Sequence, residues 1–474
     1  MNPSIFREYD IRGIADTDLA SDSLQHIARA ISRFFISKDV ATISLGRDCR
    51  TSSPRIHEIL SDELLNFGIN VIDIGLVSTP MIYFSLFHLK VGGGIMITGS
   101  HNPGEYNGLK VCLGQSTIHG DAIQEIYRFT QEVPTPSQKG IKRGACTLVD
   151  LKEPYTAAIR QSIGETLSPI KVVVDSGNGM AAGIAAEIYR GLGCQVIDLF
   201  PELDGNFPNH HPDPTQPENL TTLIKAIANE GADLGIAFDG DADRIGVVDP
   251  SGKIFYGDEL LILCARDILK INPGAKIISE VKASRKFFTD IADKGGFPIL
   301  WKTGHSLIKE KMKEEKALLA GEMSGHMFFN DRWYGFDDAI YAGARVLQIL
   351  SHQKSTAAEL LSDLPDSFTT PEIRVDCPDE IKFDVVNRAI RAFKDLDLKV
   401  VDIDGARIEF EDGWGLVRAS NTQPVLVFRY EASTQGRLAD IRKLIEGVVD
   451  QETCRLREKS LSVAPESTIS KTFH

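Results

Sequence analysis

Short apolar runs rich in β-branched residues recur along the chain, and each ends in Gly, Ser or Asp before a helical pattern begins. Clear examples are TISLGRD at 42–48, VVVDSGNG at 172–179 and KIISEVKASR at 276–285. Strand, turn and helix in alternation are typical of α/β units with mostly parallel sheets. The spacing of these strands, near residues 43, 172 and 277, indicates a unit of roughly one hundred residues used three times, although the sequences are too different to be called a repeat.

Polar, proline-containing stretches mark the expected boundaries between these units. VPTPSQKG at 133–140 resembles a connector, GVVDPSGKI at 246–254 a hairpin turn, and LSDLPDSFTTPE at 361–372 a linker. The segment after this linker is smaller and has a different order of elements. The polar end of the chain is expected to fray.

Length and composition are those of an ordinary globular protein with several domains. At roughly 150 residues per domain, 474 residues suggest about three domains. Hydrophobic residues make up 42% and charged residues 25%, which argues against a disordered chain or a coiled coil. No apolar run approaches the ~20 residues of a membrane span, so no membrane partner is expected.

Charge and cysteine content limit the expected binding partners and the expected cellular location. The chain has 52 Lys+Arg against 66 Asp+Glu, a net charge of −14, which disfavours nonspecific nucleic-acid binding. A few local Arg and Lys residues could still hold small phosphorylated ligands. The seven cysteines are dispersed without a CxxC pair, and the N-terminal residues lack an apolar leader run. Both features favour a cytoplasmic location with reduced thiols.

The first candidate for chemistry is Ser100, in the TGSHNP loop that follows the apolar run GGGIMI. A nucleophilic serine needs a base within reach. His101 is adjacent, but neighbours in sequence are not expected to face one another. The G-x-S-x-G elbow is excluded because Thr98 and Asn102 stand at its glycine positions. An isolated serine here is more often a turn or capping residue.

The second candidate is DGDADR, which follows the strand-like GADLGIAF. Its carboxylates, Asp239, Asp241 and Asp243, alternate, so a tight loop can aim all three at one point. Three hard oxygen ligands suit Mg²⁺, and without a cation they would repel one another. An EF-hand is excluded because Arg244 and Pro250 stand where its Gly and Glu are required. A solvated acidic turn is the alternative.

Three further loops combine polar side chains with neighbouring apolar strands. RASNTQP offers one cation and several hydrogen-bonding groups, as a phosphate-binding turn would, with a plain hairpin turn as the alternative. GEMSGH alternates Glu322, Ser324 and His326, a pattern that could bind sugar hydroxyls. KTGHSLIKEKM places His305 at the start of a helix, where a capping histidine is the alternative.

Two remaining motifs are weaker. EYDIRG brings Tyr9 and Arg12 together, and Arg47 and Arg50 in GRDCR could add positive charge, but alone these are expected to be surface arginines. SGNGMAAG has the spacing G-x-G-x-x-x-G with no acidic residue at the end of a second strand, so it does not predict dinucleotide binding.

Taken together, six motifs resemble those of the α-D-phosphohexomutase family, and most of all its bacterial phosphomannomutase/phosphoglucomutase members. They are EYDIRG, TGSHNP, DGDADR, KTGHSLIK, GEMSGH and RASNTQP, in the family's order and over about nine tenths of the chain. The resemblance implies four domains around a central cleft, three with related mixed α/β sheets and a C-terminal α+β domain like the TATA-binding protein. The implied domains are 1–147, 148–253, 254–365 and 366–460, followed by a flexible tail at 461–474.

The resemblance also implies roles for individual residues. Ser100 would be a phosphoserine, and the three aspartates would hold Mg²⁺ together with its phosphate. Arg244 would assist phosphoryl transfer, and Glu322 and Ser324 would bind the 3- and 4-hydroxyls of the sugar. The phosphate that is not transferred would be bound by Arg418, Ser420, Asn421 and Thr422. Cleft-lining positions would be Tyr9, Arg12, Lys110, Lys282, His305 and His326, with Lys110 and His326 as candidate base and acid and His101 as a further catalytic candidate.

The implied reaction converts hexose 1-phosphates and 6-phosphates of mannose and glucose through a 1,6-bisphosphate that turns around in the cleft. Glucose 1,6-bisphosphate would act as primer, and a monomer is expected, with an oligomer left open. Related glucosamine mutases typically have Gln where Met323 stands, which disfavours that substrate. The rival classes are a metal-dependent phosphohydrolase and a noncatalytic sugar-phosphate sensor.

Overall fold

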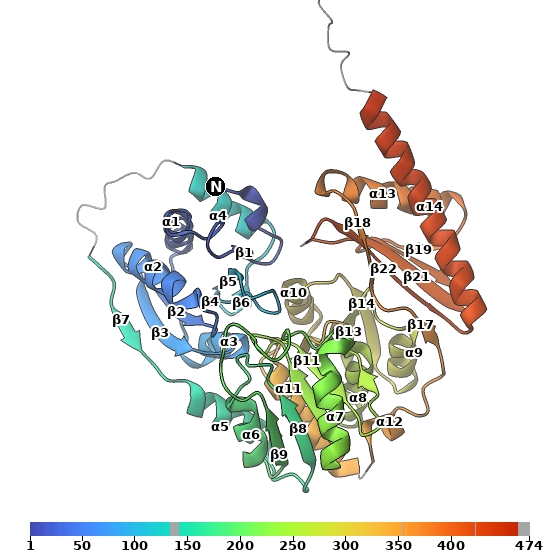
Figure 1. The fold of residues 1–474 in the computed structure, drawn as a ribbon, viewed down its shortest axis with the longest axis horizontal. Helices are drawn as coiled ribbons and strands as arrows, with labels where there is room; N and C mark the ends of the chain where they lie inside the picture. The colour runs from blue at the N-terminus through green and yellow to red at the C-terminus, as the bar shows by residue number, and fades with distance from the viewer. Residues whose placement is uncertain (133–141, 354, 422, 463–474) are drawn as a thin grey trace, which may run out of the picture. The chain divides into compact units, whose positions relative to one another are not determined.

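The computed structural model describes residues 1–132, 142–353, 355–421 and 423–462. The chain divides into two compact units, one ending at Leu364 and the other beginning at Pro365. Three β-sheets belong to the first unit and one to the second (Figure 1).

The first sheet lies at the N-terminal end of the chain. Its elements are η1 (Pro3–Ile5), β1 (Ile11–Ile14), α1 (Ser21–Ser37), β2 (Thr42–Arg47), α2 (Ser53–Asn66), β3 (Asn70–Leu76), α3 (Thr79–His88), β4 (Gly93–Ile97), β5 (Tyr106–Leu113), β6 (Ser116–Thr117), α4 (Asp121–Gln131) and β7 (Cys146–Leu148). The strand order is β1-β5-β4-β2-β3-β7, and β6 pairs with β5. Strands β2, β3 and β4 are parallel, whereas β5 runs antiparallel to β4.

Apolar periodicity explains why these elements form. In α1, Leu24, Ile27, Ile31 and Phe34 are buried at spacings of three and four residues, which gives the helix one apolar face. Strand β4 is buried along its whole length, as expected for a parallel strand covered on both faces. Helices α1, α2 and α4 contribute to one core with this sheet, and α3 contributes to another.

The second and third sheets follow in sequence. The second domain contains α5 (Lys152–Ile163), β8 (Lys171–Asp175), α6 (Ile184–Gly191), β9 (Gln195–Leu199), η2 (Pro217–Leu220), α7 (Thr221–Glu230), β10 (Leu234–Phe238), β11 (Ile245–Val248) and β12 (Ile254–Phe255). The third contains α8 (Gly257–Ile271), β13 (Lys276–Glu280), α9 (Arg285–Asp293), β14 (Phe297–Trp301), α10 (His305–Glu315), β15 (Leu319–Gly321), β16 (Met327–Phe329), α11 (Ala339–Gln353) and α12 (Ala357–Leu360). Their strand orders are β12-β11-β10-β8-β9 and β14-β13-β15-β16.

One four-strand pattern occurs in all three sheets. The orders β3-β2-β4-β5, β9-β8-β10-β11 and β14-β13-β15-β16 are equivalent. In each order, the second strand pairs in parallel with the strands on both sides of it, and the fourth returns antiparallel to the third. The hundred-residue unit expected from the sequence therefore exists as structure, beginning at β2, β8 and β13. The loops after β4, β10 and β15 occupy equivalent places in the three domains.

The second unit is built differently. It contains β17 (Phe368–Thr369), β18 (Ile373–Asp376), α13 (Asp379–Asp395), β19 (Lys399–Val401), β20 (Ala406–Phe410), β21 (Gly413–Ala419), β22 (Val425–Ala432) and α14 (Gln435–Ser462). All pairings in the order β17-β22-β21-β20-β19 are antiparallel, and β18 also pairs with β22. Side chains of α13 and α14 share a core with one face of this sheet, including Ile408, Phe428 and Ile441.

Two of the three expected boundaries lie within the described residues. The hairpin at 246–254 is present, because β11 and β12 pair antiparallel. The linker at 361–372 contains the division after Leu364. The connector at 133–140 lies outside the described residues, as does the expected tail beyond Ser462. None of the helices in the described ranges is both long and apolar enough for a membrane span.

Candidate active site

Three loops at equivalent positions in the three domains meet one another. Ser100 follows β4, Asp239 follows β10, and Glu322 follows β15. The Ser100 hydroxyl donates a hydrogen bond to Asp239 Oδ2 at 2.9 Å, and Arg244 forms an antiparallel backbone bridge with His326. Polar loops at the carboxyl ends of strands are where α/β folds bind ligands.

Ser100 is buried and has an unusual backbone. The residue is 2% exposed, and its backbone φ of 49° lies in the left-handed region. The Ser100 N–H donates to Thr98 Oγ1 at 2.8 Å, which helps to hold this conformation. The expectation that His101 would not face Ser100 is wrong, because Ser100 Oγ lies 3.1 Å from His101 Nδ1. The left-handed bend turns these adjacent side chains toward each other.

The three aspartates of the DGDADR loop converge. Each is fully buried, and one carboxylate oxygen from each lies within 4.8 Å of the others. Asp241 Oδ2 accepts hydrogen bonds from Thr79 Oγ1 at 2.5 Å and from Lys110 Nζ at 2.8 Å. Asp241 Oδ1 is buried without a hydrogen-bond partner among the described residues. Lys110 Nζ also pairs with Asp243.

The electrostatics of this cluster fit a divalent cation. Burial raises the pKa of Asp239 well above its ordinary value, and the carboxylates of Asp243 and Asp241 raise it further. Burial lowers the pKa of Lys110, but the same two neighbours outweigh this effect and the pKa is raised overall, so Lys110 stays protonated. Lys110 and Arg244 lie beside these carboxylates, and a divalent cation would further reduce the repulsion among them. Hard oxygen ligands suit Mg²⁺, and two of these oxygens, Asp241 Oδ1 and Asp243 Oδ1, have no hydrogen-bond partner among the described residues.

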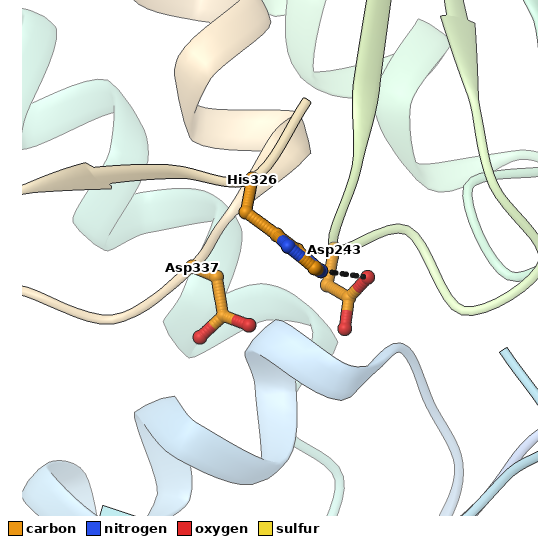
Figure 2. A group of neighbouring side chains, drawn as sticks. All are labelled: Asp243, His326 and Asp337. Carbon is orange, nitrogen blue, oxygen red and sulfur yellow. Dashed lines mark ion pairs between the residues drawn. The ribbon is translucent and has the colours of Figure 1, made fainter. Parts of the chain in front are cut away.

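His326 connects the metal-binding loop to the GEMSGH loop. Its Nδ1 lies 2.7 Å from Glu322 Oε2, and its Nε2 lies 3.3 Å from Asp243 Oδ1, the ion pair drawn in Figure 2. Arg244 Nε is 3.3 Å from His326 Nε2. Burial and Arg244 lower the pKa of His326, but Asp243 and Glu322 raise it more, and the pKa is raised overall. Ser324 Oγ lies 3.1 Å from His326 Nδ1, so the three GEMSGH side chains form one group.

Asp337 extends this group beyond the residues that the sequence indicated. One oxygen each of Asp337 and Asp243 and a ring nitrogen of His326 lie within 4.8 Å of one another (Figure 2). Asp337 also pairs with Lys309 at 2.8 Å and with His305 at 3.4 Å. The ring of His305 lies edge-on to that of Tyr9, with centroids 5.8 Å apart. The His305 and Tyr9 motifs therefore meet at this point.

Arg12 and Lys282 are placed by other contacts. Arg12 Nη1 donates to Asn102 Oδ1 at 2.5 Å, which joins the EYDIRG motif to the serine loop. Lys282 Nζ lies 3.8 Å from Glu280 Oε1 at the end of β13. Glu280 also accepts from the backbone N–H of Met323 at 3.2 Å, so Lys282 lies near the GEMSGH loop.

The RASNTQP residues form a separate cluster in the second unit. Arg418 is 6% exposed, and its Nε and Nη2 donate to the carboxylate of Asp404 at 3.1 and 3.3 Å. Ser420 Oγ accepts from the Gln423 N–H at 3.2 Å. Asn421 follows directly, and Thr422 lies outside the described residues.

Two residues that contact the serine and aspartate loops belong to none of the six motifs. Thr79 was not singled out, and the expectation that Arg50 is a surface arginine is wrong, because Arg50 is 1% exposed. Arg50 comes just after β2, and Thr79 comes just after β3. Their position beyond the carboxyl end of a parallel strand was the available signal, since that edge is where sites form.

Comparison with known proteins agrees with this architecture. Four models of phosphoglucomutase/phosphomannomutase match: alpha/beta/alpha domain I at residues 3–136, domain II at 153–252, domain III at 256–368, and the C-terminal domain at 372–448. The expected four-domain organisation is thereby confirmed, whereas the likeness of the last domain to the TATA-binding protein remains a prediction.

Individual relatives match over nearly their whole length. A phosphomannomutase/phosphoglucomutase of Pseudomonas syringae pv. tomato is 46% identical and covers 93% of each chain. A phosphoglucomutase of Neisseria gonorrhoeae is 46% identical over 94% of this chain and 96% of its own. The crystal structure of a phosphoglucomutase/phosphomannomutase family protein from Burkholderia thailandensis, 41% identical, superposes with a TM-score of 0.88 over 96% of this chain and 98% of its own. The chain therefore belongs to the phosphoglucomutase/phosphomannomutase family of phosphohexose mutases.

Proposed function

We propose that this protein interconverts the 1-phosphates and 6-phosphates of glucose and of mannose, with Ser100 as the residue that donates and regains the phosphoryl group. The observation that supports this most is the 2.9 Å hydrogen bond from Ser100 Oγ to Asp239 Oδ2. It joins a buried hydroxyl to a set of carboxylates that fits Mg²⁺. A phosphate on Ser100 would add oxygen ligands beside these carboxylates.

The reaction consists of two transfers that mirror each other. A sugar hydroxyl oxygen bonds to the phosphorus of phospho-Ser100, and the bond from phosphorus to Ser100 Oγ breaks. The sugar hydroxyl loses its proton, and the serine oxygen gains one. The product is a hexose 1,6-bisphosphate. After this intermediate turns around, its other phosphate passes back to Ser100 by the reverse steps.

Charge neutralisation is the main requirement of such a transfer. Mg²⁺, when bound by the three aspartates, would offset charge on the moving phosphoryl group. Arg244 supplies a second cation: burial lowers its pKa, but Asp239 and Asp243 raise it more, so it stays charged. Its backbone N–H donates to Asp239 Oδ1 at 3.1 Å, which fixes it beside the metal-binding loop.

Proton transfer requires groups with different proton affinities. The raised pKa of His326 favours it as proton donor. The raised pKa of Lys110 favours charge neutralisation over the general-base role that the family resemblance suggests. Burial lowers the pKa of His101, and Arg244 lowers it further, so His101 is neutral and 3.1 Å from Ser100 Oγ. Because its pKa is lowered, His101 is proposed to orient the Ser100 hydroxyl through this contact rather than to store its proton.

Sugar and phosphate recognition fall to the remaining motif residues. Glu322 and Ser324 would bind the 3- and 4-hydroxyls, and the cluster of the second unit would hold the phosphate that is not being transferred. That phosphate-binding group is Arg418, Ser420, Asn421 and Thr422, and the other residues proposed to line the site are Tyr9, Arg12, Lys282 and His305. Because none of these residues is proposed to contact the 2-hydroxyl, at which glucose and mannose differ, both sugar phosphates should be accepted.

Three accompanying properties are proposed with this function. Glucose 1,6-bisphosphate would act as primer, because it can restore a phosphoryl group lost from Ser100. The enzyme would be cytoplasmic, which agrees with seven cysteines that form no disulfide. We propose a monomer as the active species, which size-exclusion chromatography with light scattering would test.

The function is tested by a coupled isomerisation assay with free phosphate measured in parallel. Glucose, mannose and glucosamine 1-phosphates are compared, each with glucose 1,6-bisphosphate as primer. We expect 6-phosphates from glucose and mannose, much less from glucosamine, and little free phosphate. Stoichiometric phosphate release without isomerisation would identify a phosphohydrolase. Binding without any turnover would identify a sugar-phosphate sensor.

A further inference from the structure

Four backbone carbonyl groups of the serine loop point at a single guanidinium. Arg50 Nη2 donates to Ser100 O at 2.7 Å and to Asn102 O at 2.6 Å. Arg50 Nη1 donates to Pro103 O at 2.6 Å and to Tyr106 O at 3.0 Å. The loop therefore folds around this side chain from the catalytic serine to the start of β5.

The guanidinium is completely buried among the described residues. The Arg50 side chain is 0% exposed, and the Asp48 carboxylate lies 3.2 Å from its Nε. Asp48 Oδ2 also accepts the Gly99 N–H at 3.2 Å, so the same acid holds the residue before Ser100. From the second domain, Phe207 places its ring 5.2 Å from the guanidinium carbon.

The serine loop packs closely against Arg50. A Cβ added at Gly99 would lie 2.6 Å from Arg50 Cζ, so only glycine permits this approach. Ser100 itself has a φ of 49°, a conformation that non-glycine residues keep only when their surroundings impose it. The hydrogen bond from Arg50 to Ser100 O acts on the peptide group that directly follows this strained residue.

We propose that Arg50 is a positioning residue for phosphoryl transfer: it fixes the backbone of the serine loop so that Ser100 Oγ stays against the metal-binding carboxylates. Arg50 does not contact the reacting atoms. Its planar fork of donors can serve four carbonyl groups at once, which the single ammonium of a lysine cannot do. The proposal rests on the function proposed for Ser100.

The test uses full-length Arg50→Lys enzyme, with its Ser100 first phosphorylated by glucose 1,6-bisphosphate. Single-turnover transfer from the phosphoenzyme to glucose 6-phosphate is measured per phosphorylated site, beside hexose-phosphate binding by calorimetry. We expect binding within about threefold of wild type and a transfer rate lower by about 100-fold, as misplacement by an ångström can cause. A transfer rate per site equal to that of wild type would overturn the proposal, because a purely structural role reduces only the folded fraction.

Arg55→Lys is the matched control. Arg55 lies on α2, the helix that begins three residues after Arg50, and its guanidinium also donates to two carbonyl groups, Leu19 O at 2.9 Å and Ala15 O at 2.7 Å. Neither group belongs to the serine loop, so its transfer rate should match that of wild type. An equal loss in both variants would show a general effect of arginine removal and overturn the assignment.

A second variant keeps the test decisive if Arg50→Lys does not fold. Asp48→Asn leaves the guanidinium in place but removes the charge that orients it, and we expect a transfer rate lower by about tenfold with KM little changed. An unchanged rate would overturn the proposal. If wild-type enzyme itself shows no transfer from Ser100, the proposed function fails instead, so the two failures are distinguishable.

Discussion

At the scale of single residues, the two oxygens of Asp241 have different surroundings. Asp241 Oδ2 accepts from Thr79 and Lys110, whereas Asp241 Oδ1 has no partner among the described residues. A buried carboxylate oxygen without a partner is costly, and cation binding removes that cost. Asp241 Oδ1 is therefore the oxygen that we assign to the metal.

Replacing this carboxylate should weaken metal binding specifically. We expect Asp241→Asn to raise the apparent Kd for Mg²⁺ by about tenfold or more, measured by calorimetry and by the Mg²⁺ dependence of kcat. Asp233→Asn is the control, since Asp233 is an exposed carboxylate at the opposite end of β10 and should leave Mg²⁺ binding unchanged. Equal Mg²⁺ affinity in Asp241→Asn and wild type would remove Asp241 from the metal site.

At the scale of elements, the start of α8 supports the GEMSGH loop. Gly257 is the first residue of this helix, and a Cβ there would lie 1.9 Å from Glu322 O and 3.2 Å from Met323 Cα. The helix backbone and the GEMSGH loop are thus in direct contact. A side chain at this position can be accommodated only if the loop moves.

Gly257→Ala should therefore lower both stability and substrate affinity. We expect a loss of about 1–3 kcal/mol in the free energy of unfolding of the first unit, and a higher KM for hexose phosphates. Gly447→Ala in α14 is the contrast, because nothing lies within 4 Å of its Cβ position. It should stabilise its helix by about 0.5–1 kcal/mol without changing KM. Unchanged stability and KM in Gly257→Ala would contradict the contact described between α8 and this loop.

Strands and loops could be predicted from the sequence where the signal is local. Strands β2, β8 and β13 follow from apolar, β-branched runs that end in turn residues, and the loops that carry chemistry follow from motifs. Contacts between distant segments could not be predicted. Thr79 and Asp241 are 162 residues apart, and nothing near Thr79 in sequence indicates its partner. Arg50 appeared to be a surface residue because its four carbonyl partners belong to a loop whose path only the fold defines.

At the scale of the whole molecule, one strand pattern used three times explains the composition of the site. Each repeat ends its third strand in a polar loop, and these loops supply Ser100, the three aspartates and the Glu322 group. The antiparallel second unit supplies a separate cluster around Arg418. TGSHNP, DGDADR and GEMSGH are therefore far apart in the chain because each repeat contributes one of these three motifs.

Following the phosphoryl group itself shows whether Ser100 carries it between sugars. Full-length enzyme is phosphorylated with glucose 1,6-bisphosphate, mass spectrometry locates the phosphate, and its passage to hexose 6-phosphate is timed against turnover. We expect phosphate on Ser100, transferred at least as fast as isomerisation. Ser100→Ala should fold and bind sugar phosphates but lose turnover by several orders of magnitude. Phosphate on another residue, or wild-type turnover in Ser100→Ala, would show that Ser100 does not carry the phosphoryl group.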